Sequence, residues 1–292
     1  MRDGARVTIA DALREATAQL AQTSDTARLD AEVLMAHARG VSRSDLLLRH
    51  MKDAQPGTFA QLVERRAANE PVAYILGQQE FYGRKFQVTP DVLIPRADSE
   101  SVVQAALDAA PAPKRVLDCG TGSGALLLTI LAERPEAQGV GVDSSRAALA
   151  VARANAQALG LAERAQLLDA DWTRPGWADV LGRFDLIIAN PPYVEESADL
   201  APDVGVFEPP EALFSGPEGL DDYRILIPQL PQLLTETGVA VLEIGHKQAE
   251  PVSKIAEQQG FSAEVHQDLA GRDRALVLRL RLGKDESSSY LS

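Results

Sequence analysis

The sequence lacks the features that mark membrane-spanning, secreted or disulfide-bonded proteins. No apolar run reaches the roughly 18 residues of a membrane span, so we predict no transmembrane helix. The opening stretch, MRDGARVTIADALREA, has no apolar signal segment, which argues against secretion. The single cysteine, Cys119, excludes an intrachain disulfide and fits a reducing compartment. We therefore expect a cytoplasmic protein.

Histidine and positive charge are also scarce. The four histidines, at positions 37, 50, 246 and 266, lie far apart and show no metal-ligand spacing, so we predict no metal site. The formal net charge is −13, and an acidic surface repels phosphate backbones. Neither the first 80 residues nor the remainder carries a net positive charge. We therefore expect neither a nucleic acid nor a membrane as a partner.

The pattern of the 292 residues changes along the chain, which is long enough for one large and one small domain. Residues 1–80 show helical periodicity without strand patterns, which predicts a small N-terminal helical bundle that docks or shields something. Residues 81–97 place aromatic and β-branched residues around Gly83, followed by two prolines, which favours a β-hairpin linker. Residues 284–292 are expected to form a disordered tail.

Residues 98–283 alternate strands with helices, which predicts an α/β domain with a mostly parallel sheet covered on both faces. The last two strands are joined too briefly for a crossover helix, so we expect the final strand of this seven-stranded sheet to run antiparallel. The strands are expected at 115–120, 139–145, 165–171, 184–189, 238–245, 262–268 and 274–282. The helices are expected at 101–110, 124–135, 146–160, 219–235 and 248–259.

A glycine-rich segment, VLDCGTGSGA, follows the first strand of this domain. Gly120, Gly122 and Gly124 let the backbone turn sharply and approach a ligand closely. The spacing also fits a dinucleotide fingerprint, but the carboxylate of Asp118 would repel a pyrophosphate. The same carboxylate suits S-adenosylmethionine, which carries a sulfonium and an amino acid in place of phosphates. The loop therefore favours S-adenosylmethionine over a dinucleotide.

Further cofactor contacts are expected after the next two strands. Asp143 could accept both ribose hydroxyls, or it could cap the helix that follows. Asp171 could accept the amino group of an adenine, and Trp172 could stack on the ring or fill the core. Cys119 has no histidine nearby in the sequence, so we do not expect it to be a nucleophile.

The tetrapeptide Asn190-Pro191-Pro192-Tyr193 follows the predicted strand FDLIIA, at the edge where ligands of open α/β sheets bind. The side-chain oxygen of Asn190 and the carbonyl of Pro191 can accept the two N–H bonds of a planar amino group. Tyr193 offers that group a flat face. Holding the weakly nucleophilic nitrogen in line with a sulfonium methyl could supply about 7–11 kcal/mol of the barrier. The alternative is an ordinary turn that ends a strand.

Four segments together resemble the HemK/PrmC family, the bacterial N5-glutamine methyltransferases of peptide chain release factors. The segments are EPVAYILGQQEFYGRKFQVTPDVLIPRADSE, VLDCGTGSGA, NPPYV and FEPPEALFSGPEGLDDYR. The resemblance implies an N-terminal helical domain, a β-hairpin linker and a Rossmann-like methyltransferase domain. It also implies a substrate, the glutamine of the Gly-Gly-Gln motif in class 1 release factors. Ala97 departs from the family, which usually has proline there.

The resemblance also assigns roles to individual residues. Cofactor contacts would come from Gly120, Thr121, Gly122, Ser123, Gly124, Asp143, Trp172 and Asn190. The glutamine side chain would be held by Asn190, Pro191, Pro192 and Tyr193.

Three other functions stay open at the level of the sequence. A sister enzyme methylates a glutamine of a ribosomal protein. Adenine-N6 DNA methyltransferases carry the same tetrapeptide, because an adenine amino group resembles a carboxamide, but they must flip a base and neutralise phosphates. A catalytically silent module could use the fold to hold an adenosine ligand, although the presence of Asp118, Asp143 and Asn190 argues against it.

Overall fold

A computed structural model describes residues 7–281, which form two compact units. The helical unit comprises residues up to 79 together with 88–90 and 200–208, and the α/β unit comprises 80–87, 91–199 and the chain from 209 onward. None of the helices in the described residues has the length and apolar character that a membrane span requires. The expected tail, 284–292, lies outside the described residues.

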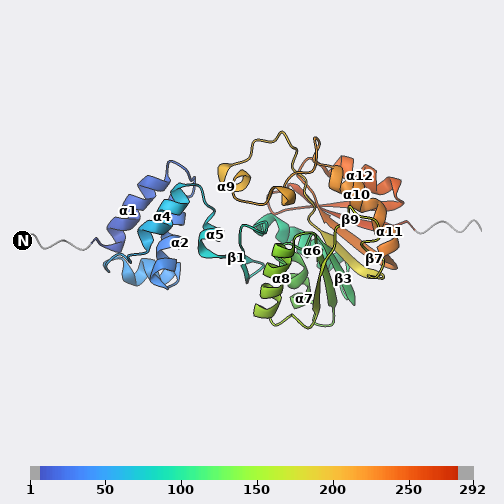
Figure 1. The fold of residues 1–292 in the computed structure, drawn as a ribbon, viewed down its shortest axis with the longest axis horizontal. Coiled ribbons are helices and arrows are strands. Elements are labelled where there is room, and N and C mark those ends of the chain that lie inside the picture. Colours follow the sequence, from blue (N-terminus) through green and yellow to red (C-terminus); the bar gives the residue numbers. More distant parts are fainter. Residues whose placement is uncertain (1–6, 282–292) are drawn as a thin grey trace, which may run out of the picture. The chain divides into compact units, whose positions relative to one another are not determined.

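The helical unit contains the short helices at the blue end of the ribbon in Figure 1. They pack through a shared apolar core. Local signals bound the first two helices: the Thr8 side chain accepts from the N–H of Asp11 at the start of α1, and Gly40 ends α2 with φ of 72°. Leu13 and Leu34 are fully buried in this core. The elements are α1 (Ile9–Leu20), α2 (Ala27–Arg39), α3 (Arg43–Asp45), the π-helical turn η1 (Leu46–His50), α4 (Phe59–Ala67), α5 (Val72–Leu76) and the distant segment α9 (Pro202–Gly205).

A two-stranded hairpin follows α5, made of β1 (Gln78–Phe81) and β2 (Arg84–Gln87). It occupies an earlier stretch than the expected 81–97, because Gly77 ends α5 in the left-handed region, with φ of 69°, directly before the strand. The turn residues Tyr82 and Gly83 have φ of 51° and 70°, as a type I′ turn requires.

The hairpin contributes side chains to the core of the α/β unit. Phe81 and Phe86 belong to that core, and their ring centroids lie 6.1 Å apart in an edge-to-face arrangement. The N–H of Gln87 also donates to the side-chain oxygen of Asn155, 2.7 Å away. The hairpin is therefore a built-in part of this unit as well as a connection.

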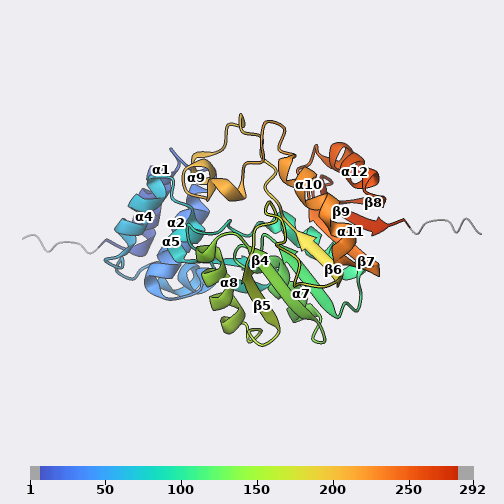
Figure 2. The same cartoon turned by 45° about the vertical axis from the view of Figure 1, so that its right-hand side comes forward.

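The α/β unit is built on a seven-stranded sheet in the order β5-β4-β3-β6-β7-β9-β8 (Figure 2). The strands from β5 to β7 pair in parallel, and β9 pairs antiparallel with both β7 and β8, which confirms the predicted fold class. The strands are β3 (Arg115–Cys119), β4 (Gln138–Asp143), β5 (Ala165–Asp169), β6 (Phe184–Ala189), β7 (Leu234–Glu243), β8 (Phe261–Gln267) and β9 (Asp273–Leu280).

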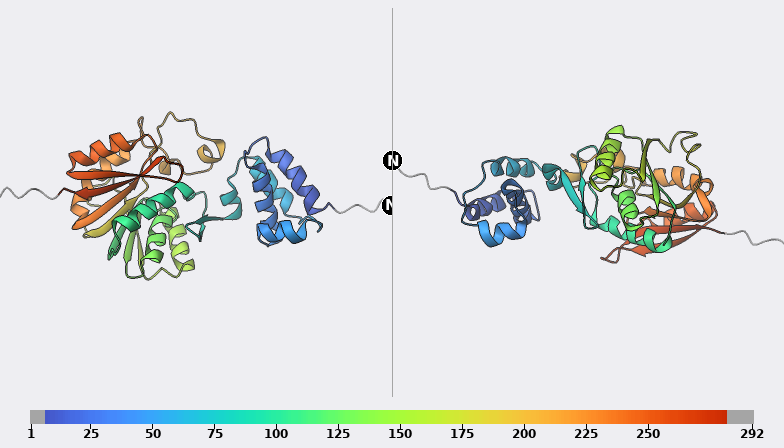
Figure 3. Two further views of the ribbon diagram at one scale, coloured as in Figure 1. Left: turned by 180° about the vertical axis from the view of Figure 1, so that it is seen from behind. Right: turned by 90° about the horizontal axis from the view of Figure 1, so that it is seen from below.

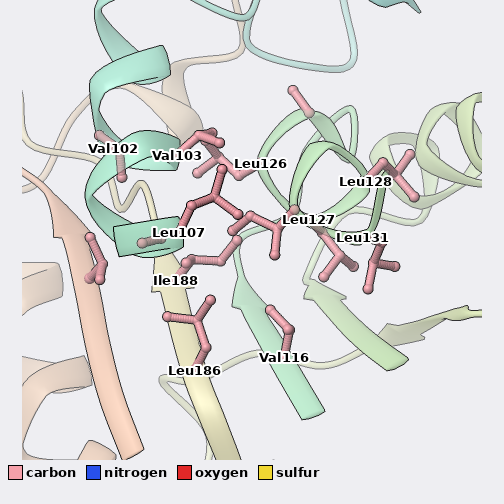
Figure 4. Packing of buried hydrophobic residues seen from close by; sticks show 14 of the residues in the cluster. Val102, Val103, Leu107, Val116, Leu126, Leu127, Leu128, Leu131, Leu186 and Ile188 are labelled. Atoms are coloured by element: carbon pink, nitrogen blue, oxygen red, sulfur yellow. The ribbon is translucent and has the colours of Figure 1, made fainter. Parts of the chain in front are cut away.

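Successive residues of each central strand supply opposite faces of the sheet. In β6, Leu186 and Ile188 enter one core, whereas Ile187 and Ala189 enter the other. Figure 4 shows part of the first core, in which side chains of α6 and α7 pack against the sheet. In Figure 3, helices α10 to α12 are orange and lie apart from α6, α7 and α8, which are teal and green. The helices are α6 (Glu100–Ala109), preceded by the 3₁₀ turn Ala97–Ser99, α7 (Ala125–Glu133), α8 (Arg146–Ala158), α10 (Asp221–Leu226), α11 (Leu230–Leu233) and α12 (Ala249–Gln258).

The helix expected at 219–235 is interrupted. A 3₁₀ turn at Ile227–Gln229 separates α10 from α11, and β7 begins at Leu234. Pro228 and Pro231 lie inside this stretch, and proline lacks the N–H that an α-helical ladder needs.

Candidate active site

The two segments singled out in the sequence leave the sheet side by side. β3 and β6 are paired, with Cys119 opposite Ala189 at their carboxyl ends. β4 lies on the other side of β3, so the strand order reverses direction here and opens a crevice between β3 and β6. The glycine loop 120–124 and the tetrapeptide 190–193 both begin at this crevice, as their place after buried strands predicts.

The glycine loop is held against the end of β4. Gly120, Gly122 and Gly124 have φ of 77°, 53° and 82°, in the left-handed region that favours glycine. The N–H groups of Gly120 and Thr121 both donate to the carbonyl of Val142 at 2.9 Å. These bonds leave the loop curved around one side of the crevice.

Asp143, at the end of β4, accepts two backbone hydrogen bonds. The N–H of Gly122 donates to Oδ2 and the N–H of Ser145 to Oδ1, each at 2.8 Å. Burial raises the pKa of Asp143, and the bonds from Ser145 and Gly122 oppose that shift. The side chain that caps α8 is Ser145, which accepts from Ala148. Asp143 therefore fixes the loop and still lines the crevice.

A cavity of about 520 Å³ fills the crevice in the α/β unit. Most of the residues predicted to bind a cofactor or a substrate line it. They are Gly120, Thr121, Gly122, Ser123, Asp143, Asp171, Trp172, Asn190 and Pro192.

Three other predicted residues lie just behind this lining. Gly124 precedes α7, and Pro191 is buried. Asp118 is 1% exposed, and its Oδ2 accepts the hydroxyl of Thr121 at 2.7 Å. Its Oδ1 has no hydrogen-bond partner in residues 7–281. Burial raises the pKa of Asp118 to about 7, and the Thr121 bond opposes that shift.

Tyr193 also lies outside the cavity lining. Its hydroxyl is 3.4 Å from Oε1 of Glu243, and its ring packs against the core that contains Ile187 and Ala189. Burial raises the pKa of the Tyr193 hydroxyl above its ordinary value. The structure thus places the tyrosine as a support beside the crevice, and its contact with a substrate stays a prediction.

Trp172 forms one wall of the cavity and is fixed by a partner that the sequence analysis did not name. Its indole Nε1 donates to Oδ1 of Asp222 at 3.2 Å. The side chain of Asp171 also lines the cavity, but both of its oxygens already accept bonds. Thr173 donates through its N–H and hydroxyl to one oxygen, and Arg174 donates to the other. The Thr173 hydroxyl lowers the pKa of Asp171.

Gly120 and Trp172 approach so closely that the wall depends on glycine. A Cβ at position 120 would lie 2.9 Å from Cη2 of Trp172, at a backbone φ of 77°. We expect Gly120→Ala to displace the indole and weaken S-adenosylmethionine binding about tenfold or more, as measured by calorimetry. Gly40→Ala is the control, because φ there is 72° but no atom lies within 4 Å of the added Cβ. Equal affinities in both variants would contradict the prediction.

The cavity also contains residues that the sequence analysis left unassigned. Phe81 and the residues after the hairpin form part of the lining, although we had expected only a linker there. The signal was available, because VLIPRADS is among the segments that carry the family resemblance. The additional lining residues are Phe81, Asp91, Val92, Leu93, Pro95, Arg96, Ser99, Ala125, Leu126, Ser144, Ser145, Ala148, Ala170, Thr173, Pro209, Glu211, Ala212 and Asp222.

The chemistry of these residues fits S-adenosylmethionine. Asp118 lies behind the glycine loop and not in the lining, so its carboxylate would favour a cationic ligand through its charge and not through a direct contact. Each oxygen of Asp143 accepts one backbone bond and keeps a further lone pair, at the strand end where ribose hydroxyls bind. Trp172 gives a flat wall. The acidic lining suits a cation better than it suits a pyrophosphate.

Comparison with known proteins agrees with this chemistry. Residues 11–77 match the PrmC N-terminal domain family, and residues 98–205 match the methyltransferase small domain family. A methyltransferase from Pyrococcus furiosus shares the fold, with a TM-score of 0.50, 16% identity, and coverage of 68% of this chain and 89% of that one. The fold and the site thus define an S-adenosylmethionine-dependent methyltransferase.

Two curated relatives are more closely similar over nearly the whole chain. The release factor glutamine methyltransferase of Cereibacter sphaeroides is 44% identical over 93% of this chain and 98% of its own length. The release factor glutamine methyltransferase of Moorella thermoacetica is 42% identical over 93% of this chain and 98% of its own length. The chain belongs to the release factor glutamine methyltransferase family, as the resemblance predicted.

Proposed function

We propose that this chain transfers a methyl group from S-adenosylmethionine to the side-chain amide nitrogen, N5, of the glutamine in the Gly-Gly-Gln motif of class 1 peptide chain release factors. The observation that carries the proposal is the position of the tetrapeptide 190–193, beside the glycine loop at one crevice. The names of the curated relatives support this choice of substrate.

The tetrapeptide suits an acceptor that is a planar amide. S-adenosylmethionine supplies an electrophilic methyl group on a sulfonium. Asn190, which lines the cavity, would accept one amide N–H through its side-chain oxygen, and the carbonyl of Pro191 would accept the other. Both acceptors favour the positive charge that develops on the nitrogen as it attacks. The nitrogen–carbon bond would form as the sulfonium carbon–sulfur bond breaks, the sulfur would leave as a neutral thioether with the bonding electrons, and one N–H proton would pass to solvent. No side chain forms a covalent bond.

The decisive experiment is a labelling assay. The full chain is incubated with methyl-labelled S-adenosylmethionine and purified release factor, and the labelled peptides are then mapped. We expect the label on the glutamine of the Gly-Gly-Gln motif. Label on a ribosomal protein or on DNA adenine would replace this proposal by one of the alternatives, and an absence of transfer would support a silent binding module.

We further propose that the helical domain, residues 1–80, recognises the body of the substrate. None of the described residues of this domain lines the cavity. The domain also matches a family of its own, over residues 11–77, separate from the methyltransferase match. Deletion of residues 1–77, which spares both strands of the hairpin, is expected to lower methylation of intact release factor at least about tenfold more than methylation of a short Gly-Gly-Gln peptide. Steady-state rates on both substrates, with cofactor binding measured as a control, test this difference. Equal losses on both would contradict docking.

The remaining parts of the proposal concern partners and location. Release factors are the expected macromolecular partners, and the net charge of −13 supports an enzyme that does not bind nucleic acid. We place the enzyme in the cytoplasm, where release factors act, in keeping with its single buried thiol, Cys119.

A further inference from the structure

Gln248, which follows β7 and does not line the cavity, hydrogen-bonds the end of the tetrapeptide. Gln248 lies between β7 and α12, and its side-chain nitrogen donates to the carbonyls of Tyr193 and Gly219, each at 3.0 Å. Its side-chain oxygen accepts the N–H of Gly245, also at 3.0 Å. One amide group thus ties together three loops, and one of these is the end of the tetrapeptide.

Two glycines allow this close approach. A Cβ on Gly219, where φ is 67°, would overlap the Tyr193 carbonyl group and lie 3.0 Å from its carbon. A Cβ on Gly245 would lie 2.8 Å from the side-chain oxygen of Gln248 and 3.5 Å from Cδ2 of the Tyr193 ring. The loops that contain Gly219 and Gly245 therefore pack closely against Tyr193.

The far end of the same tyrosine meets a buried carboxylate. Glu243 ends β7 and is 1% exposed, and its Oε1 lies 3.4 Å from the Tyr193 hydroxyl. Burial raises the pKa of the Glu243 carboxyl, and its interaction with the side chain of Ser99, a cavity-lining residue, opposes that shift. The adjacent residue Leu242 pairs with Ala189, so Glu243 is level with Asn190 in the sheet.

We propose that Gln248 and Glu243 are positioning residues for methyl transfer, which hold Tyr193 by its carbonyl and its hydroxyl and so fix the acceptor groups of Asn190 and Pro191. The proposal deepens, and rests on, the proposed glutamine methyltransferase function. Neither residue lines the cavity, so neither is expected to touch the cofactor. Their effect reaches the reaction through the backbone of the tetrapeptide, in which a displacement of about 1 Å can cost about 10²-fold in rate.

The test compares Gln248→Ala with His246→Ala, a substitution of an exposed residue in the same loop. Gln248→Ala is expected to lower kcat on a Gly-Gly-Gln peptide by about tenfold to a hundredfold, with the Kd for S-adenosylmethionine within about twofold of wild type. His246→Ala should leave both unchanged. A kcat within twofold of wild type in Gln248→Ala, an equal loss in His246→Ala, or a matching loss of cofactor affinity would each overturn the proposal.

A second measurement does not depend on the identity of the substrate. The N–H of Val194, the residue after Tyr193, donates to the carbonyl of Leu213 at 2.8 Å. Hydrogen exchange at this amide should be faster in Gln248→Ala than in wild type or His246→Ala, because the neighbouring carbonyl has lost its anchor. Unchanged exchange would overturn the positioning role. A wild-type chain that fails to methylate release factor would instead refute the proposed function, and the exchange rates would still decide this inference.

Glu243 is buried, so truncation to alanine would leave a cavity that destabilises the fold. The test therefore uses substitutions of similar size. Glu243→Gln keeps the size and an acceptor oxygen for Tyr193, so it should retain most of the kcat that Glu243→Leu loses. Equal kcat values for the two variants, in proteins that bind S-adenosylmethionine normally, would remove Glu243 from the proposal.

Discussion

Asn190→Ala is expected to abolish methyl transfer while leaving most of the cofactor affinity intact. Asn190 lines the cavity directly after β6, and its side-chain oxygen is the proposed acceptor for one N–H of the substrate amide. Loss of one positioned hydrogen-bonding group in an active site typically costs about 10²–10³-fold in kcat. Because orientation of the amide is lost as well, we expect at least about 10³-fold. Single-turnover rates at saturating S-adenosylmethionine measure this effect.

Asn190→Asp provides the matched comparison. Aspartate keeps an acceptor oxygen on a side chain of the same length but replaces the amide NH₂ group with a second, negatively charged oxygen. It should therefore retain more activity than alanine if the oxygen is the working atom. An Asn190→Ala enzyme with normal turnover would rule out the proposed grip, and an aspartate variant no better than alanine would show that an acceptor oxygen alone is not sufficient.

Asp118→Asn is expected to change how the stability of the ligand-free protein depends on pH. Burial raises the pKa of Asp118 from 3.8 to about 7. Between these values the unfolded chain releases a proton that the folded chain retains, so the carboxyl lowers wild-type stability as pH rises from about 4 to about 7. Asparagine does not titrate. The advantage of Asp118→Asn in free energy of unfolding should therefore grow by about 2–3 kcal/mol between pH 5 and pH 8, since one pKa unit is about 1.4 kcal/mol.

Urea unfolding at the two pH values measures this difference, with Glu136→Gln, a substitution of an exposed carboxylate, as the control. The control should show no such growth.

Asp118→Asn is also expected to weaken S-adenosylmethionine binding, because its amide would no longer provide a negative charge for a cationic ligand. We expect Kd to rise about tenfold or more at pH 8. A pH-independent stability difference would show that Asp118 is ionised without penalty in the folded chain.

Much of the site could be predicted because it follows from local rules. Gly120 and Asn190 both follow apolar strands, and parallel strands end at one edge of a sheet, so their proximity was expected and is observed. The antiparallel last strand was also predictable, because the stretch between β8 and β9 is too short to return the chain to the other end of the sheet. These features depend on residues that are close in sequence or on general topology.

The supports of the site depend on contacts that no local pattern encodes. The carbonyl of Tyr193 meets Gln248, which is 55 positions away in the sequence, through an amide side chain that resembles any surface glutamine. Likewise, the short helix α9 groups with the helical unit, where Asp203 lies 3.8 Å from the buried Arg66. Arg66 in turn binds Asp30 at 2.7 Å. Nothing in the alternation of strands and helices predicts that this stretch leaves its own domain.

The position of β9 bears on how the chain folds as it is made. This strand is the last of those described along the sequence, yet it lies between β7 and β8. On the ribosome, β7 would be synthesised with one edge unpaired, and β8 would have no neighbour until Leu280 emerged. An exposed edge of this kind invites aggregation, and pairing that waits for distant segments is slow. A nascent chain cut short before residue 273 would lose the strand that joins β8 to the rest of the sheet, so messages that end early should yield proteins prone to degradation.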